Sequence, residues 1–464
     1  MTLGLVVGHS IFNSLSMTMS SDPFVEARRQ LTKEQFIDAV MREPVEGIVD
    51  LEPIRNKCQK VVQQQGLVWQ CDYIQGGLGN LGNTWVNCMY FGIESGATSI
   101  ILPPVGKRND KNLIDNGNAK DTTNLPILYD LNHFIETWKQ ACPHITVYKS
   151  PDEVPNLKGN GGRMLTPHQI PGLEVVRQTV FDFHTWRAKF DEWLETNYAA
   201  DKLQNMSVEK PVHVGAKGLM FAGHRASMDP RFTHAFTRMF ASRNSLRRLG
   251  AAAVWDLEQR MGRPVVSDAI LFPELYAKTY GLPTAAPLQG TTLDKVAVNT
   301  SQVTHLLRNR VTDATKFKWP GYEFQAPSYL REALERNLTS IYLAAGSAES
   351  TQRFKAEAEA ADLTTYTKED VLGEEEMTEY NALTWDNKAV VDFQVLLHSS
   401  FFAGYGQSTF SQTMVMRRSA LPDAGPNQVN PWRPFTDKSF EIWRDNLSSI
   451  YCSLHMQTLD RIWP

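Results

Sequence analysis

The sequence predicts an α/β protein with two halves, each a parallel sheet with helices on both faces. Three observations support this: the length of the chain, a strand–glycine loop–helix–strand unit between residues 67 and 104, and an alternation of short strands with helices after residue 295. At roughly 150 residues a domain, 464 residues suffice for more than one hydrophobic core. We place the boundaries at residues 1–66 (N-terminal tail and helices), 67–210 (first α/β domain) and 211–464 (second α/β domain).

The composition is that of a compact globular protein. Hydrophobic residues make up 42% of the chain and charged residues 21%, which excludes the disordered, collagen-like and disulfide-scaffold classes. The formal net charge of -4 indicates no broad nucleic-acid-binding face, although it is compatible with a local basic pocket.

Cysteine usage and the N-terminus favour a cytoplasmic enzyme. The five cysteines are odd in number, far apart and never in a C-x-x-C pair, so they are predicted to be small buried side chains and neither a disulfide framework nor a zinc site. The first twenty residues contain no Lys or Arg and only a short apolar run, unlike a signal peptide; an incomplete N-terminus would instead be compatible with the secretory lumen. No stretch approaches the ~18 apolar residues that a membrane span needs.

The first half contains a glycine-rich segment between two predicted elements. A strand at 67–69 precedes QGGLGNLGN at 75–83, and a helix over 84–97 and a buried strand over 98–104 follow. Gly77, Gly79 and Gly82 fit G-x-G-x-x-G, but no acidic residue ends the second strand, which argues against a dinucleotide. Asn83 stands where a P-loop needs lysine, which argues against a nucleoside triphosphatase.

Two interpretations of this glycine segment remain. Glycines let the backbone approach a ligand closely, and the amides at a helix start attract an anion, with the Asn80 amide projecting nearby. The alternative is a tight strand-to-helix turn that binds nothing.

Helices are also predicted over 24–41, 173–198 and 230–261. In the second half, strands are predicted at 295–300, 302–307, 339–346, 363–367 and 399–406, and helices at 328–337, 348–361, 386–398 and 408–420. Ligands of open α/β sheets bind at the carboxyl ends of such strands, so the residues that follow them are the candidates for a binding site.

Two of these strand ends predict a diphosphate site. Ser408 and Thr409 begin a helix, where free backbone amides and hydroxyls can bind phosphate oxygens; the alternative for Ser408 is plain N-capping. Arg308 ends another strand and could hold a phosphate through two bonds, with Arg310 as a competitor for that role. By residue type alone, His305 is expected to be structural rather than catalytic.

Four segments resemble the GDP-fucose O-fucosyltransferase superfamily: QGGLGN at 75–80, THLLRNRVTDA at 304–314, residues 341–370 and residues 383–411. The glycine loop of that family matches Gly76 to Asn80, its H-x-R matches His305 and Arg308 with an insertion, and its S-[ST]-F matches Ser408, Thr409 and Phe410. The resemblance implies two Rossmann-like domains (the GT-B arrangement) with a GDP-sugar between them. It also implies a divergent member of the superfamily, because the acidic neighbour of the family arginine is replaced here.

The resemblance further implies a metal-independent, inverting transfer of fucose or another sugar to a hydroxyl acceptor, with no cofactor besides the GDP-sugar. Asn80 and Arg308 would be catalytic, and the residues that bind the donor would be Gly77, Gly79, Asn80, His305, Arg308, Ser408, Thr409 and Phe410. Consistent with this, the sequence contains neither the D-x-D of metal-dependent sugar transferases nor H-E-x-x-H. His224, Asp229 and Asp392 are candidate general bases by residue type only, and Asp392 is expected on a helix that covers the sheet.

Two other functions stay open, because a fold does not determine an activity. One is a fungal biosynthetic enzyme on a recruited GT-B fold, such as a tRNA-dependent arginine-containing cyclodipeptide synthase. The D-D-x-x-E motif of that family is absent, and its tRNA would have to be bound by local basic patches such as Arg247–Arg248 and Arg417–Arg418. The other is a non-catalytic protein that keeps only the fold.

Overall fold

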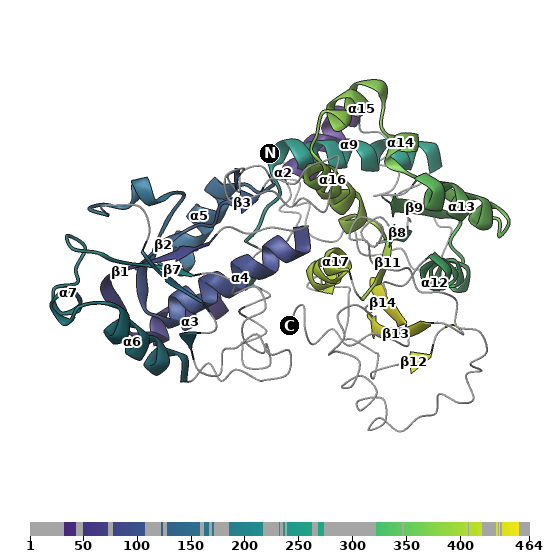
Figure 1. Cartoon of the computed structure of the whole chain (residues 1–464). Helices are drawn as coiled ribbons and strands as arrows, with labels where there is room; N and C mark the ends of the chain where they lie inside the picture. The colour runs from purple at the N-terminus through teal and green to yellow at the C-terminus, as the bar shows by residue number, and fades with distance from the viewer. Residues whose placement is uncertain are drawn as a thin grey trace, which may run out of the picture.

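The described part of the computed structural model contains two large sheets, each with its own helices, and one small two-stranded sheet (Figure 1). The residues that it describes are 32–42, 50–72, 78–106, 122–123, 128–157, 162–166, 169–170, 185–216, 232, 235–236, 239–261, 268–272, 322–345, 348–406, 408–419, 433–434, 436 and 439–453.

The first sheet has five strands in the order β5-β2-β1-β7-β6, and every neighbouring pair is parallel. Its strands are β1 (Gln64–Cys71), β2 (Ala97–Ile101), β5 (Thr146–Tyr148), β6 (Arg163–Leu165) and β7 (Val212–Ala216). The helices of this half are α3 (Glu52–Lys60), α4 (Leu78–Glu94), α5 (Leu131–Ala141), α6 (Trp186–Asn197) and α7 (Ala200–Gln204), with a 3-10 turn η3 (Pro151–Glu153) and a small ribbon of β3 (Val105–Gly106) and β4 (Thr122–Thr123).

Helices α4 and α6 of the first half lie on the face of the sheet that carries Trp69. The Trp69 ring contacts Trp186 and Phe190 of α6, and α4 lies so close that a Cβ on Gly92 would be 2.9 Å from the Trp69 ring. The opposite face carries a small cluster of Val68, Ile101 and Val154. The parallel five-stranded sheet is thus flanked by helices, as predicted, and α4 and α6 lie on the same face.

The second sheet has seven strands in the order β10-β9-β8-β11-β14-β13-β12. They are β8 (Asp268–Phe272), β9 (Ser340–Ala345), β10 (Thr364–Tyr366), β11 (Phe401–Tyr405), β12 (Arg433–Pro434), β13 (Ser439–Arg444) and β14 (Ser448–Ser453). The pairs from β10 to β14 are parallel, as predicted, whereas β13 pairs antiparallel with both β14 and β12. A direct turn joins β13 to β14, and so short a connection allows only an antiparallel pair.

Helices cover both faces of this second sheet, as predicted. In β9, Ile341 and Leu343 face one cluster with Tyr322 of α12 and Phe354 of α13, while Tyr342 faces the main core beneath α16 and α17. The helices are α12 (Tyr322–Glu335), α13 (Ala348–Glu359), α14 (Lys368–Val371), α15 (Glu374–Asn381), α16 (Trp385–Leu397) and α17 (Thr409–Ser419). The strands predicted at 295–300 and 302–307 lie outside the described residues.

The predicted domain boundaries differ from the sheet membership at two places. Strand β7 begins at Val212, after the predicted boundary at residue 210, yet it pairs with β1 of the first sheet. Helix α2 (Lys33–Arg42), expected in an N-terminal tail, packs against α9 (Asn244–Met261), which in turn packs against α16 of the second half. Pairing between distant segments sets these boundaries, and local sequence patterns do not contain that information.

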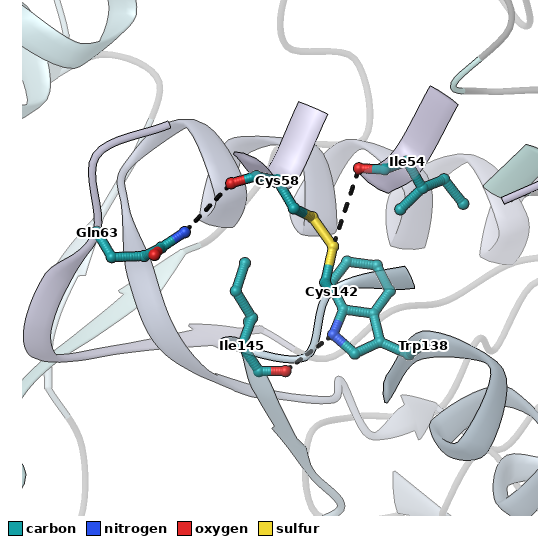
Figure 2. Close-up of a disulfide and its surroundings, with 6 residues drawn as sticks. All are labelled: Ile54, Cys58, Gln63, Trp138, Cys142 and Ile145. Atoms are coloured by element: carbon teal, nitrogen blue, oxygen red, sulfur yellow. Dashed lines mark hydrogen bonds between the residues drawn. A yellow bond between two sulfur atoms is a disulfide. The ribbon is translucent and has the colours of Figure 1, made fainter. Parts of the chain in front are cut away.

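Four of the five cysteines form two disulfides, so the prediction of unpaired cysteines was wrong for them. Cys58 of α3 is bonded to Cys142 at the end of α5, and Cys71 of β1 is bonded to Cys88 of α4, each pair with its Cα atoms 5.8 Å apart. Figure 2 shows the first pair beside Trp138, whose indole N–H donates to the Ile145 carbonyl at 3.0 Å. Sequence separations of 84 and 17 residues carry no pairing signal, so only the fold could reveal these bonds.

None of the helices in the described ranges combines the length and the apolar character that crossing a membrane would require.

Candidate functional site

The glycine-rich segment of the first half is largely helical. Helix α4 begins at Leu78, so Gly79 and Asn80 lie in its first turn and not in a loop that precedes a helix at residue 84, as predicted. Gly77 lies outside the described residues. Glycine costs a helix about 1 kcal/mol relative to alanine, but Leu81 and Trp85 are fully buried and their packing offsets that cost.

The second strand-to-helix connection forms where predicted, from β11 into α17. Ser408 is buried, and its hydroxyl accepts a hydrogen bond from the Ser411 amide at 3.3 Å, so it caps α17. Its own amide donates to the Tyr405 carbonyl at 2.9 Å. Capping, the alternative interpretation of Ser408, is therefore observed. Thr409 begins the helix and Phe410 packs on Phe393 of α16.

Helices α4 and α17 contact each other, and α4 also contacts α16 (Figure 1). The two helices that carry the matched glycine and S-[ST]-F segments, which are more than 300 residues apart in sequence, are thus packed together. In the sequence, α4 is the next element after β1 and α17 is the next element after β11, so both helices start on the carboxyl side of a parallel sheet.

The residues predicted to bind phosphate from the strand before α12 are not among those described. His305, Arg308 and Arg310 lie outside the described residues, as do the candidate bases His224 and Asp229. Their roles stay predictions.

The third candidate base, Asp392, belongs to a buried charged cluster. It lies on α16, a sheet-covering helix as expected, and accepts hydrogen bonds from the Tyr342 hydroxyl at 2.7 Å and from Lys368 Nζ at 3.1 Å. Burial raises the pKa of Asp392, against the opposing effect of Lys368 and Tyr342. An Asp committed to two donors inside the protein is poorly placed to take a proton from an acceptor substrate.

Lys368 connects this cluster to the carboxyl end of β9 in the second sheet. Its ammonium group also donates to the carbonyl of Ala345, the last residue of β9, at 3.1 Å. The sequence signal for the cluster was an aspartate within the apolar run VVDFQVLL, but its partners come from two other elements and could not be inferred.

The basic pair Arg417–Arg418, a candidate for binding tRNA, is buried. Arg418 is 1% exposed and Arg417 is 7% exposed, and Arg417 donates to the Phe240 carbonyl at 2.7 Å. These guanidinium groups are buried inside the protein and therefore do not form a basic surface. At the other pair, Arg248 is exposed, 4.0 Å from an oxygen of Asp38, and Arg247 reaches the Val40 carbonyl at 3.5 Å.

Within the described part of the chain, His, Cys, Asp and Glu side chains do not gather in any group of three or more that could hold a metal ion.

His213 is a buried titratable group of the first sheet. It lies in β7, and its Nε2 atom has no hydrogen-bond partner among the described residues. Burial, together with the charge of Lys202, lowers the pKa of His213 to about 4. The folded protein therefore favours the neutral imidazole.

Stability is expected to fall as the pH drops from about 6.5 toward 4, since the unfolded chain binds the His213 proton first. The full shift would correspond to about 3 kcal/mol; partial solvent screening reduces this to about 1–2 kcal/mol. Urea unfolding of the wild type and of His213→Gln at several pH values measures the effect. The difference between the two proteins should change over this pH range, and a constant difference would contradict the assignment.

Comparisons with known proteins find similarity to solved structures alone. No protein-family model matches the chain, and no curated protein matches it. Among solved structures, the chain is similar to POFUT1 in its apo form (9% identity, 78% of this chain and 97% of that one, TM-score 0.42) and in complex with GDP-fucose (10% identity, 77% and 96%, TM-score 0.42). It is also similar to a mutant of Arabidopsis thaliana FUT1 in complex with GDP (9% identity, 89% and 85%, TM-score 0.34). The assignment of the α/β fold is made from the two sheets and their helices, and not from these similarities.

Proposed function

We propose that this protein is a glycosyltransferase that moves fucose or another sugar from a GDP-sugar to a hydroxyl acceptor, with inversion and without a metal ion. The observation that carries the proposal is the contact between α4 and α17, the two helices whose first turns match motifs of the GDP-fucose O-fucosyltransferase superfamily. Helix starts of this kind favour anions, because their amide groups and dipoles are positive.

In the proposed reaction, the acceptor oxygen forms a bond to the anomeric carbon while the bond from that carbon to the phosphate oxygen of GDP breaks. The electron pair stays on the departing diphosphate, and the acceptor proton passes to a base that we do not assign. Arg308 and the amides at the start of α17 would stabilise the developing negative charge, and Asn80 would lie near the sugar. Because Ser408 already caps α17, the backbone amides of Thr409 and Phe410 are its principal expected donors to phosphate.

The test is binding of GDP in the presence of a metal chelator. GDP at about 100 times its dissociation constant should stabilise the folded protein by about 2.7 kcal/mol and raise its melting temperature. Arg308→Ala should abolish this stabilisation, and Arg310→Ala is the matched control. If Arg310→Ala abolishes it instead, Arg310 is the phosphate-binding arginine. A panel of GDP-sugars then identifies the donor.

The tRNA-dependent alternative predicts a different result. In that case GDP gives no stabilisation, and charged tRNA binds with an affinity that falls steeply with salt. The buried positions of Arg417 and Arg418 remove one of the basic patches on which this alternative relied.

A further inference from the structure

The two disulfides lie at opposite ends of the strands of the first sheet. Cys71 is the last residue of β1, at the carboxyl end, where it pairs with Ala216 of β7. Cys58, in contrast, lies in α3, which leads into the amino end of β1, and its partner Cys142 follows α5, which leads into the amino end of β5 (Figure 2). Only the Cys71–Cys88 bond therefore lies at the carboxyl end of the strands, where the proposed donor site is located.

The Cys71–Cys88 bond also fixes the point at which α4 leaves the sheet. Downstream of Cys88, Gly92 packs directly on the Trp69 and Ile100 side chains of β1 and β2. Upstream, residues 78–87 continue past the end of β1, a length of about 15 Å at 1.5 Å per residue. Helix α4 contacts α17 and α16 of the second half. A small rotation at Cys88 would thus be amplified at the first turn of α4.

Both sulfurs of this bond are enclosed. Cys71 is 1% exposed and Cys88 is 2% exposed, and the Trp69 indole N–H donates to Cys88 Sγ at 3.2 Å. A reductant must therefore wait for α4 to open locally. A dithiol reductant then attacks one sulfur as the thiolate, which breaks the S–S bond of the protein and forms a mixed disulfide. The second thiol of the reductant attacks this mixed disulfide and frees the protein cysteine. The cysteine pair gains two electrons and two protons, and the dithiol is oxidised to its own disulfide.

We propose that the Cys71–Cys88 disulfide is the redox-sensitive positioning element of the donor site, so that GDP binds tightly only when this pair is oxidised. This rests on the proposed function. The Cys58–Cys142 disulfide stabilises the same half of the protein without affecting the donor. In an oxidising compartment the site is assembled, whereas a glutathione-reduced cytosol favours the reduced pair and weak donor binding.

The experiment compares oxidised protein, dithiothreitol-reduced protein, Cys71→Ser/Cys88→Ser and the control Cys58→Ser/Cys142→Ser. The dissociation constant of GDP is measured by calorimetry at a temperature where all four are folded, and hydrogen exchange of α4 is measured without GDP. We expect a loss of affinity of at least about tenfold on reduction and in the Cys71/Cys88 variant, together with faster exchange in α4, and a change below about twofold in the control. If the double serine variant does not fold, Cys71→Ala/Cys88→Val refills the space with apolar atoms.

Three results would overturn the proposal. One is equal GDP affinity in the oxidised, reduced and Cys71/Cys88 variant proteins. Another is an equal loss of affinity in the Cys58/Cys142 control. The third is thiol titration of denatured, non-reduced protein that finds all five cysteines free rather than Cys452 alone. If oxidised protein binds no GDP at all, the proposed function fails, and the positioning role is then decided by the α4 exchange: unchanged exchange on reduction contradicts it.

Discussion

Replacing Arg418 by alanine is expected to lower the free energy of unfolding by about 3–5 kcal/mol, because several buried oxygens would lose a charged donor together. The guanidinium of Arg418 holds the end of α16 and the turn between β13 and β14. Its hydrogen bonds, between 2.9 and 3.3 Å, go to the carbonyls of Leu396, Leu397, Ser400 and Leu447 and to the Ser448 hydroxyl. Chemical denaturation monitored by tryptophan fluorescence measures the loss.

Two further variants make the Arg418 result interpretable. Arg418→Lys keeps the charge but not the planar fork, so it should recover only part of the lost stability. Arg248→Ala removes an exposed arginine near Asp38 and should change the free energy of unfolding by at most about 0.5 kcal/mol. A loss below about 1 kcal/mol for Arg418→Ala would show that these carbonyls are satisfied without it.

Replacing Glu332 by glutamine is expected to cost a similar amount, about 3–5 kcal/mol, since it removes the counter-charge of Arg336 and leaves Arg444 with the Glu441 carboxylate alone. Glu332 is 1% exposed on α12. Arg444 of β13 donates to both of its carboxylate oxygens at 2.7 and 3.1 Å, and Arg336 and the Tyr451 hydroxyl also bond to it. The group fastens α12 to the antiparallel end of the second sheet.

The pH dependence of this variant has a definite sign. Burial alone would raise the pKa of Glu332, but the Tyr451 hydroxyl and the charges of Arg336 and Arg444 lower it below its ordinary value. The stabilisation is therefore present above the unfolded pKa of about 4.5 and is lost as the pH falls further. Equilibrium unfolding at pH 7 and near pH 3 should show the difference between wild type and Glu332→Gln shrinking. Glu335→Gln, in an exposed i,i+4 pair with Arg331, is the matched control with an effect near zero.

Part of the secondary structure of the second half was predictable. Strands β9, β10 and β11 and helices α12, α13, α16 and α17 overlap predicted elements, whereas β8, β12, β13 and β14 were not predicted. The helix expected over 386–398 is α16 (Trp385–Leu397), and the strand expected over 399–406 contains β11 (Phe401–Tyr405). Their hydrophobic periods are local properties of the chain. In the first half, the glycines at 79 and 82 hid the true start of α4, because burial of Leu81 and Trp85 by distant segments outweighs the poor helix propensity of glycine.

Part of the candidate site could be predicted in the same way. The strand-to-helix position of Ser408 is confirmed, because Gly404 and Gly406 end the apolar strand and hydroxyl residues begin the next helix. The sequence did not predict which groups make contact at the site. The missed contacts are the hydrogen bond from the Ser411 amide to the Ser408 hydroxyl, the packing of α4 on α17, and the cluster of Lys368, Asp392 and Tyr342.

By itself, the sequence determined the α/β class and the positions of part of the helices and strands, since hydrophobic period and turn residues act over a few neighbouring positions. The tertiary structure alone decided that β7 joins the first sheet, that Cys71 pairs with Cys88, and that Arg418 points inward. Each of these depends on which distant segments become neighbours, and that choice is made by burial and hydrogen bonding across the whole chain.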